Sequence, residues 1–280
     1  MNVIGKYTPY QMNQIINCYK SMCNQNLESA VKNVTSGNFG KLCVALSKTT
    51  LDYDVWCLHE AIKGLGTDDD CLIEILVGRS NTDIVAMNKA YKIAYNKSLE
   101  DDVKGDTSGD YRTTLVSLLQ GNRNETNIQR DVESDVDALY KAGEGKIGTT
   151  ESTFITILTN RSYSHLRMVF DKYQQKYTHS MEKVIDSEFS GNIKKTLGGI
   201  VKTTTNLSEY VAKQFENSMK GAGTKDSKLI RLAVRYREPA LMKKIKEDYV
   251  KLYNKPLAKR IEGETRGDYR KLLLMCIGEL

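Results

Sequence analysis

Apolar residues recur along most of this chain at spacings of three and four positions, with polar residues between them. The segments 72–76 and 229–234 show this spacing, which is typical of amphipathic α-helices. No segment sustains the alternation of apolar and polar residues that a half-buried strand requires. Only three of the 280 residues are proline, so few helices are interrupted. The pattern predicts an all-α protein.

The chain aligns with itself when it is shifted by 72 residues, which indicates internal repeats. The shift places Ser-Gly-Asn-Phe at 36–39 on Ser-Gly-Asp-Tyr at 108–111. Related segments return near residues 190 and 266, and we interpret this signature as a helix start. The sequence therefore predicts four repeats, at residues 1–50, 51–124, 125–205 and 206–280.

A glycine turn followed at a nearly fixed distance by a carboxylate occurs three times. The turns are Gly64-Leu65-Gly66-Thr67, the longer Gly143-Glu144-Gly145-Lys146-Ile147-Gly148-Thr149, and Gly221-Ala222-Gly223-Thr224. Counted from the last glycine of each turn, Asp106 and Glu188 follow after 40 residues and Glu264 after 41. We expect each turn to join two helices, with its threonine as N-cap of the second. Each acid is expected at the end of the loop before a later helix.

These residue types predict a cation site in repeat 2, with copies in repeats 3 and 4. Ca²⁺ binds main-chain carbonyl oxygens and bidentate carboxylates. The carbonyls of Ile62, Gly64 and Gly66 could turn into one concavity that both oxygens of Asp106 close. Such a cage leaves a divalent cation under-coordinated and positive, which favours an anionic oxygen from a lipid phosphate. Repeat 1 lacks the turn and has Val34 in place of Asp106, so we expect no metal there.

At these turns and acids the chain resembles the annexin family, whose repeats carry a Met/Leu-Lys-Gly-x-Gly-Thr turn and an acid at this distance. The resemblance covers nearly the whole chain, 51–280 in particular, and includes the family's variant turn in the third repeat. It implies four repeats of five helices each, arranged in a slightly curved disc whose convex face bears the Ca²⁺ loops.

The resemblance also implies the ligands in each repeat. In repeat 2 they are the carbonyls of Ile62, Gly64 and Gly66 with Asp106, in repeat 3 those of Gly143, Lys146 and Gly148 with Glu188, and in repeat 4 those of Met219, Gly221 and Gly223 with Glu264. Repeat 4 has one extra residue, which we place near Tyr236 to Pro239. Whether a loop absorbs this residue or it misplaces Glu264 stays open.

The first repeat departs from the family pattern. Annexins carry four full repeats behind a variable N-terminal tail, whereas here the tail and half of repeat 1 are missing. Either the sequence is truncated or the lineage has lost this part, as divergent protist annexins such as the alpha-giardins vary in this way. The sequence leaves both explanations open.

Composition and charge fit a cytoplasmic protein that meets membranes peripherally. The six cysteines form no Cys-x-x-Cys pair, and no apolar run is long enough to span a bilayer or to form a signal core. The net charge of +6 favours anionic partners, either acidic phospholipid or nucleic acid. No nucleic-acid-binding motif accompanies it, so we expect no nucleic acid partner.

Two hypotheses for function follow. The first is Ca²⁺-dependent binding to acidic phospholipid membranes, by a chain that is a monomer in solution and associates laterally on the membrane. The alternative is a cytoskeletal or scaffold protein that binds other proteins through the same fold, with Ca²⁺ secondary. No phosphate-binding loop or pair of nucleophile and base stands out, so we expect no enzyme.

Apolar residues at the turn tips have two interpretations. Leu65 and Ile147 could dip into a lipid interface or pack on a neighbouring loop. Trp56, the only tryptophan, stands beside Val55 and Leu58 and is predicted to be core.

Overall fold

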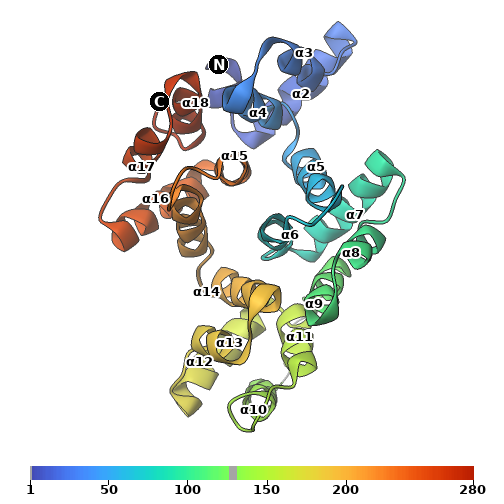
Figure 1. The fold of residues 1–280 in the computed structure, drawn as a ribbon, viewed down its shortest axis with the longest axis vertical. Helices are drawn as coiled ribbons and strands as arrows, with labels where there is room; N and C mark the ends of the chain where they lie inside the picture. Colours follow the sequence, from blue (N-terminus) through green and yellow to red (C-terminus); the bar gives the residue numbers. More distant parts are fainter. Residues whose placement is uncertain (1, 126–130) are drawn as a thin grey trace. The chain divides into compact units, whose positions relative to one another are not determined.

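The computed structural model describes residues 2–125 and 131–280, which form helices joined by short loops (Figure 1). Within these two ranges no β-strand occurs, and the single sheet-like contact is an isolated bridge between Asn124 and Arg161. The prediction of an all-α protein is confirmed.

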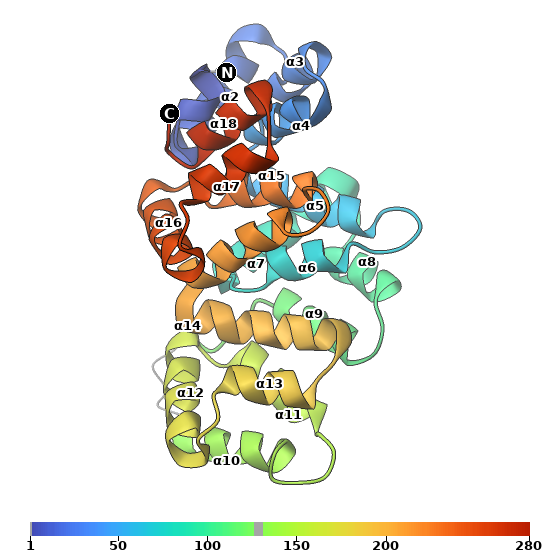
Figure 2. The same cartoon turned by 60° about the vertical axis from the view of Figure 1, so that its left-hand side comes forward.

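The helices form two compact units. One unit consists of Met1–Tyr53 with Ser208–Leu280, and the other is Asp54–Leu207. We call them the terminal unit and the central unit. In the terminal unit, α4 (Gly37–Leu46) packs against α15 (Asp226–Arg235) and α18 (Gly267–Cys276), so the two ends of the sequence share one core (Figure 2).

The central unit contains two successive groups of five helices. The first group is α5 (Thr50–Ile62), α6 (Asp69–Leu76), α7 (Asn81–Tyr95), α8 (Leu99–Asp106) and α9 (Gly109–Leu119). The second group is α10 (Val132–Ala142), α11 (Glu151–Asn160), α12 (Tyr163–Tyr177), α13 (Met181–Glu188) and α14 (Gly191–Met219). Helix α14 is interrupted at Asn206, where φ is −153° and ψ is 96°, and its second part belongs to the terminal unit.

The terminal unit holds an incomplete and a complete group. The incomplete one is α1 (Asn2–Lys6), α2 (Pro9–Cys23), α3 (Leu27–Val34) and α4. The complete one is the second part of α14, then α15, α16 (Pro239–Tyr253), α17 (Leu257–Glu264) and α18. Four helical repeats, the first of them incomplete, therefore follow one another as predicted.

Short sequence signals explain where the helices begin. Ser80 accepts a hydrogen bond from the main-chain N–H of Asp83, whose carboxylate accepts one from the N–H of Ser80, which forms a capping box. The Ser-Gly signature works differently, because the glycine that opens α9, Gly109, has a φ of +57°. Side chains with a Cβ rarely adopt this angle, which explains why glycine opens α4, α9, α14 and α18 alike.

One buried tyrosine recurs at the same place in repeats 2, 3 and 4. Tyr91, Tyr173 and Tyr249 each occupy the eleventh position of a 15-residue helix and are fully buried. Each hydroxyl donates a hydrogen bond to an acid, namely Asp102 for Tyr91, Glu144 for Tyr173 and Glu216 for Tyr249. Burial and the acid partner raise the pKa of all three phenols. The repeats thus share a buried tyrosine bonded to an acid, although the acid lies in α8 in repeat 2, in the glycine turn in repeat 3 and in α14 in repeat 4.

The prediction for Trp56 was wrong. Its side chain is 38% exposed, while Val55 and Leu58 beside it are buried. Helix α5 turns by 100° per residue, so adjacent positions face different directions, and apolar neighbours do not fix the direction of Trp56.

Candidate functional site

In repeats 2, 3 and 4 a glycine turn connects the first helix to the second. In the turn between α5 and α6, Gly64 and Gly66 have φ angles of +101° and +87°. Gly221 and Gly223, between α14 and α15, have nearly the same angles, +102° and +92°. A Cβ added at any of these four glycines would meet no atom within 4 Å. The conformation therefore requires glycine, and the turns are open to solvent.

The three turns close with the same main-chain hydrogen bond. The N–H that donates belongs to the residue after the threonine, and the carbonyl that accepts lies near the end of the preceding helix. The N···O distances are 2.8 Å for Asp68 and Ala61, 2.7 Å for Thr150 and Ala142, and 2.7 Å for Lys225 and Ser218. The turn of repeat 3 is one residue longer and gains a further bond of 2.8 Å from Gly145 N to Tyr140 O. The turn of repeat 3 therefore forms the same closing hydrogen bond as the other two, although its sequence and length differ.

Each distant carboxylate is the last residue of a helix, not part of a loop as expected. Asp106 ends α8, Glu188 ends α13 and Glu264 ends α17. In each case the next residue has extended backbone angles, and its N–H still bonds back into the helix. The acid is consequently held by a regular helix, which fixes its position better than a loop.

The threonine that ends each turn bonds to the distant acid instead of capping a helix. The N-cap residues are Asp68, Thr150 and Lys225, one position later than predicted. The oxygen–oxygen distances are 3.1 Å from Thr67 Oγ1 to Asp106 Oδ2, 2.5 Å from Thr149 Oγ1 to Glu188 Oε2, and 3.2 Å from Thr224 Oγ1 to Glu264 Oε2. The structure thus brings each predicted acid to its turn, and the extra residue of repeat 4 does not misplace Glu264.

In repeat 2 a cavity of about 460 Å³ lies between the turn and the acid, and Lys63 and Lys97 line it beside three carboxylates. Ile62 and Gly64 line it from the turn, and Asp101, Asp102 and Asp106 line it from α8. Main-chain oxygens and carboxylates are the ligands that a hard divalent cation prefers. The residues of repeat 2 therefore fit Ca²⁺.

In repeat 3 the acid lies directly against the turn. A Cβ at Gly143 would come within 3.4 Å of Glu188 Cδ. The other carboxylate of this turn, Glu144, points to different partners, because it accepts from the Tyr173 hydroxyl at 2.8 Å and contacts His179 Nδ1 at 2.5 Å. Glu188 is thus the carboxylate positioned to join the turn carbonyls, and repeat 3 also fits Ca²⁺.

In repeat 4 an arginine reaches the predicted ligands. Arg260 Nη1 lies 2.5 Å from Glu264 Oε1, and its Nη2 donates to the main-chain carbonyl of Met219. Its Nε lies 3.2 Å from Glu216 Oε2, so the guanidinium is held on both sides. A positively charged side chain of the protein itself therefore contacts both Met219 and Glu264.

The arginine stands one helical turn before its acid. The residue four positions before the acid is Asp102 in repeat 2, Val184 in repeat 3 and Arg260 in repeat 4. Side chains four apart on a helix are neighbours, so Arg260 reaches Glu264 directly. This spacing is visible in the sequence, but it lies outside the turns and acids on which the predicted sites rest.

Repeat 1 has an apolar residue in the place of the acid. Val34 ends α3 and its side chain is 80% exposed. Thr35, which follows it, donates its hydroxyl to Val31 O at 2.7 Å. Residue 34 therefore provides no carboxylate.

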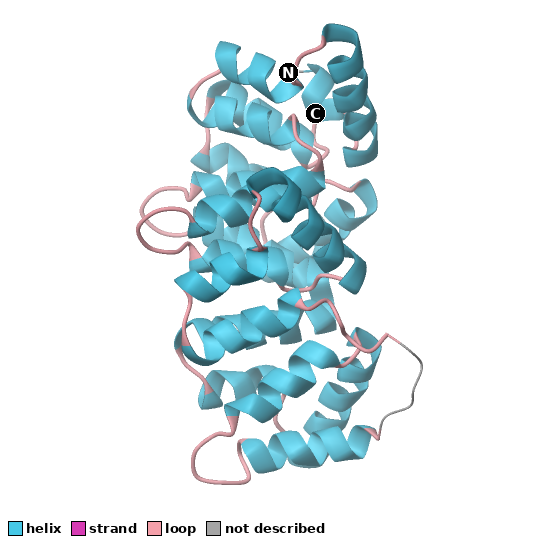
Figure 3. Cartoon of the chain, turned by 90° about the vertical axis from the view of Figure 1, so that its right-hand side faces the viewer, coloured by secondary structure: helices cyan, strands magenta, loops and turns pink. Residues whose placement is uncertain are grey.

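The tips of both turns in the central unit are fully exposed. Leu65 and Ile147 have relative exposures of 108% and 104%, so the interpretation that they pack on neighbouring loops is wrong. The loop between α5 and α6 and the loop between α10 and α11 project from the same side of the central unit (Figures 2 and 3). One flat surface could therefore touch both tips.

Side chains alone build no metal centre in the part of the chain that the structure describes. Over residues 2–125 and 131–280, no three His, Cys, Asp or Glu side chains come together to hold a metal. A cation site in this region has to include main-chain oxygens. The same residues contain no helix with the length and apolar character needed to cross a membrane.

Comparisons with known proteins agree with this architecture. A family model described as Annexin matches residues 1–46, 53–118, 134–200 and 210–276. Annexin A11 of Oryctolagus cuniculus is 42% identical over 280 residues, which cover 99% of this chain and 56% of that protein, so the chain spans little more than half of its length. The solved structure of annexin III is similar with a TM-score of 0.93 and 33% identity, over 99% of this chain and 86% of that one. A calcium-bound annexin (Sm)1 has a TM-score of 0.89 and 30% identity, over 100% and 84% of the two chains.

Proposed function

The chain belongs to the annexin family, and from this premise we propose that it binds acidic phospholipid membranes through Ca²⁺ held at the glycine turns of repeats 2 and 3. The observation that carries the proposal is the bond from each turn threonine to its acid, which brings two segments 39 positions apart to one place. The calcium-bound annexin (Sm)1, similar over the whole chain, supports it.

The ligands we propose are main-chain carbonyls and one acid in each turn. They are Ile62, Gly64, Gly66 and Asp106 in repeat 2, and Gly143, Lys146, Gly148 and Glu188 in repeat 3. When bound, Ca²⁺ supplies positive charge that attracts phosphate oxygens of the lipid. Thr67 and Thr149 hold the acids in place, and the glycines let lipid headgroups approach the backbone closely.

Residues around the two turns favour a membrane surface. Leu65 and Ile147 offer exposed apolar side chains at the tips. Lys146 places positive charge beside Ile147, whereas Lys63 beside Leu65 pairs with Glu60 at 2.8 Å. Both turns project from one side of the central unit, so both can engage one bilayer. Two weak sites on one rigid body bind more tightly together than either alone.

We further infer that the protein acts by binding rather than by catalysis. It would be cytoplasmic and attach to membranes peripherally when Ca²⁺ rises, as a monomer in solution that associates laterally once attached. The turns and acids account for this role without a nucleophile or a redox group.

Co-sedimentation with phosphatidylserine vesicles tests the proposal. We expect the purified chain to pellet with the vesicles in Ca²⁺ at physiological salt and to stay in the supernatant in EGTA. Vesicles of phosphatidylcholine alone serve as the uncharged control and should not pellet the chain. Failure to pellet with phosphatidylserine at millimolar Ca²⁺ would overturn the proposal.

Repeat 4 should respond to removal of its arginine. We expect Arg260→Met to raise the Ca²⁺ affinity of the turn formed by Met219, Gly221 and Gly223 with Glu264, by about tenfold or more, because a positive charge no longer opposes the ion. Competition with a chelating dye measures this affinity. Lys259→Met, which removes an equal charge from the adjacent residue of α17, is the matched control. Equal affinities in the two variants would show that Arg260 does not hinder Ca²⁺.

A further inference from the structure

Repeats 2, 3 and 4 each have an arginine immediately before the N-cap of the third helix. These are Arg79 before Ser80, Arg161 before Ser162, and Arg237 before Glu238. In the central unit both arginines pair with a buried acid. Arg79 pairs with Asp54, and Arg161 pairs with Asp135 through two bonds of 2.7 and 2.9 Å.

The acid that neutralises this arginine is absent from repeat 4. Asp54 lies seven residues before Ala61, and Asp135 lies seven before Ala142, the carbonyls that close the two turns. The turn of repeat 4 closes on Ser218, and the residue seven before it is Val211. Repeat 4 therefore keeps the arginine but has an apolar residue where its partner stands in the other repeats.

The positive charge of the buried Arg237 side chain is consequently hardly neutralised. Its side chain is 8% exposed, its Nη1 reaches only the carbonyl of Ile4 at 3.5 Å, and its Nε has no hydrogen-bond partner. Burial lowers the pKa of this guanidinium, and no carboxylate in the described residues acts to raise it. An uncompensated charge in such a place is unfavourable unless something else neutralises it.

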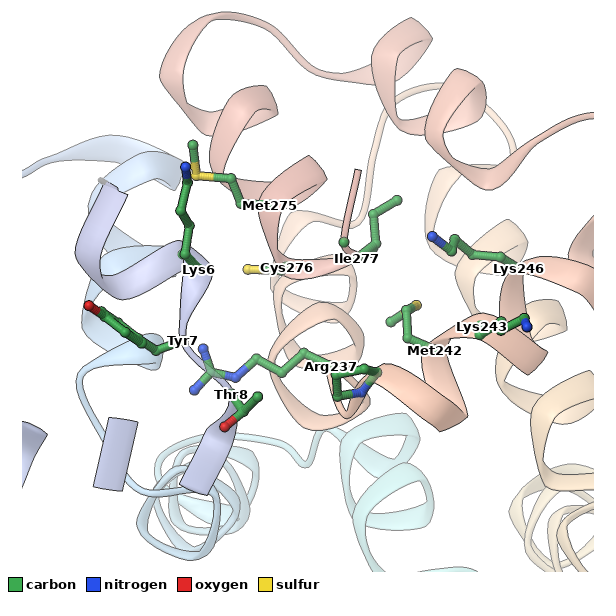
Figure 4. A pocket seen from close by; sticks show the side chains of 13 residues that line it. Lys6, Tyr7, Thr8, Arg237, Met242, Lys243, Lys246, Met275, Cys276 and Ile277 are labelled. Atoms are coloured by element: carbon green, nitrogen blue, oxygen red, sulfur yellow. The ribbon is translucent and has the colours of Figure 1, made fainter. Parts of the chain in front are cut away.

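Arg237 lines a cavity of about 200 Å³, and Figure 4 shows the charged ends of Lys6 and Lys243 on different sides of it, apart from the Arg237 guanidinium. Lys6, Lys243 and Lys246 also line it, and Thr8 adds a hydroxyl. Only Lys246 is paired, with Glu279 at 2.7 Å, while Lys6 and Lys243 form no ion pair with any described residue. Figure 4 shows the Arg237 side chain extending across the cavity, with its guanidinium toward Tyr7 and Thr8. The cavity thus has an excess of positive charge.

We propose that this cavity binds a phosphate group at the guanidinium of Arg237, and that the positive charges of Lys6 and Lys243 on its lining attract the anion. Arginine offers several N–H donors in a planar fork that matches the oxygens of phosphate. The volume is below that of the usual pockets for larger organic ligands, which suits inorganic phosphate or the end of a phosphate monoester. The phosphate supplies Arg237 with the negative charge that Asp54 supplies to Arg79 and Asp135 to Arg161.

This phosphate site is separate from the turn of repeat 4. The turn ends where α15 begins, at Asp226, and Arg237 follows the end of α15 at Arg235. A helix of ten residues is about 15 Å long, so the two sites lie at opposite ends of it. Phosphate binding therefore needs neither Ca²⁺ nor a membrane, and its test is independent of the function proposed above.

Calorimetric titration of the whole chain with inorganic phosphate, in EGTA and at constant ionic strength set with chloride, tests the site. We expect saturable binding to the wild type, and a loss of affinity of about tenfold or more in Arg237→Met. Val211→Asp should have the same effect, because it restores the internal carboxylate that repeats 2 and 3 possess. Absence of binding to the wild type, or equal affinity in Arg237→Met, would overturn the proposal.

Substitutions of exposed lysines test the proposal even if Arg237→Met and Val211→Asp fail to fold. Lys6→Gln with Lys243→Gln should weaken phosphate binding, whereas Lys244→Gln, on the adjacent exposed position of α16, should not. Equal weakening by Lys244→Gln would mean general charge attraction and would contradict a built site. A parallel titration with glycerol 3-phosphate identifies the source: comparable affinity assigns the site to phosphate monoesters, and binding of inorganic phosphate alone assigns it to the free ion.

Discussion

Replacing Asp106 by asparagine and Glu188 by glutamine together should abolish Ca²⁺-dependent pelleting of the chain with phosphatidylserine vesicles. Each substitution removes the one negative charge that we propose among the ligands of its turn. We expect it to weaken Ca²⁺ binding there by about 100-fold or more, because even residues that only support a metal ligand contribute about 10- to 100-fold. Loss of both sites also removes the advantage of binding at two points. The measurement is the pelleted fraction against Ca²⁺ concentration.

The amide replacements preserve the fold around the turns. Asparagine and glutamine keep an oxygen that can accept from Thr67 and Thr149, so the contact between turn and helix is retained. Asp110→Asn with Asp186→Asn changes two exposed carboxylates nearby and the same net charge, and should leave pelleting unchanged. Pelleting, or membrane association in cells, that persists in the first double variant would favour a scaffold that recognises other proteins.

Removal of the Asp135 carboxylate should destabilise the central unit by about 3–5 kcal/mol. Asp135 is 7% exposed and accepts from both Arg161 and His165, the latter at 2.9 Å. In Asp135→Ala the guanidinium of Arg161, whose side chain is 16% exposed, remains largely buried without its counter-charge. The urea midpoint, followed by far-ultraviolet circular dichroism, measures the loss.

The neighbouring acid Asp137 provides a control on the same helix. Its carboxylate is exposed and pairs with Lys176 at 2.6 Å on the surface of α10. Exposed pairs contribute little, so Asp137→Ala should leave the urea midpoint nearly unchanged. Similar midpoints for the two variants would show that the buried cluster is not a major source of stability.

The Asp135 cluster should also affect stability in acid. Burial alone would raise the pKa of Asp135, but hydrogen bonds from Arg161 and His165 outweigh it and hold the pKa below its usual value. A lowered pKa stabilises the folded state above the unfolded pKa of about 3.9, and this contribution disappears as pH falls through the folded value. The midpoint difference between wild type and Asp135→Ala should therefore shrink below about pH 4.

Much of the fold could be predicted because its signals repeat. The Ser-Gly segment marks a helix start wherever it occurs, since Gly109 and its equivalents have the same left-handed backbone. The distance from Gly66 to Asp106, equal in repeat 3 and one residue longer in repeat 4, predicts that turn and acid meet, and the threonine bonds show this contact. Such patterns can be predicted from sequence because the same short segment adopts the same backbone geometry in each repeat.

Features that depend on three-dimensional neighbours were missed or misplaced. Threonine is a common N-cap, so the sequence predicts Thr67 at the helix start, yet its hydroxyl bonds to Asp106, which lies 39 residues away. Trp56 was assigned to the core from its neighbours in sequence, although the direction of one side chain on a helix depends on what packs there. The spacing of Arg260 four positions before Glu264 is visible in the sequence, but its contact with Met219 joins two helices and is not.

The half-exposed position of Trp56 gives the chain an optical reporter confined to one repeat. It is the only tryptophan beside 16 tyrosines, so emission excited at long ultraviolet wavelengths originates in α5 alone. Trp56 stands six residues before Ile62, about 9 Å along the helix axis from the glycine turn of repeat 2. A shift in the emission wavelength of Trp56 would therefore report changes around that turn. The other repeats contain no tryptophan and contribute no emission under this excitation.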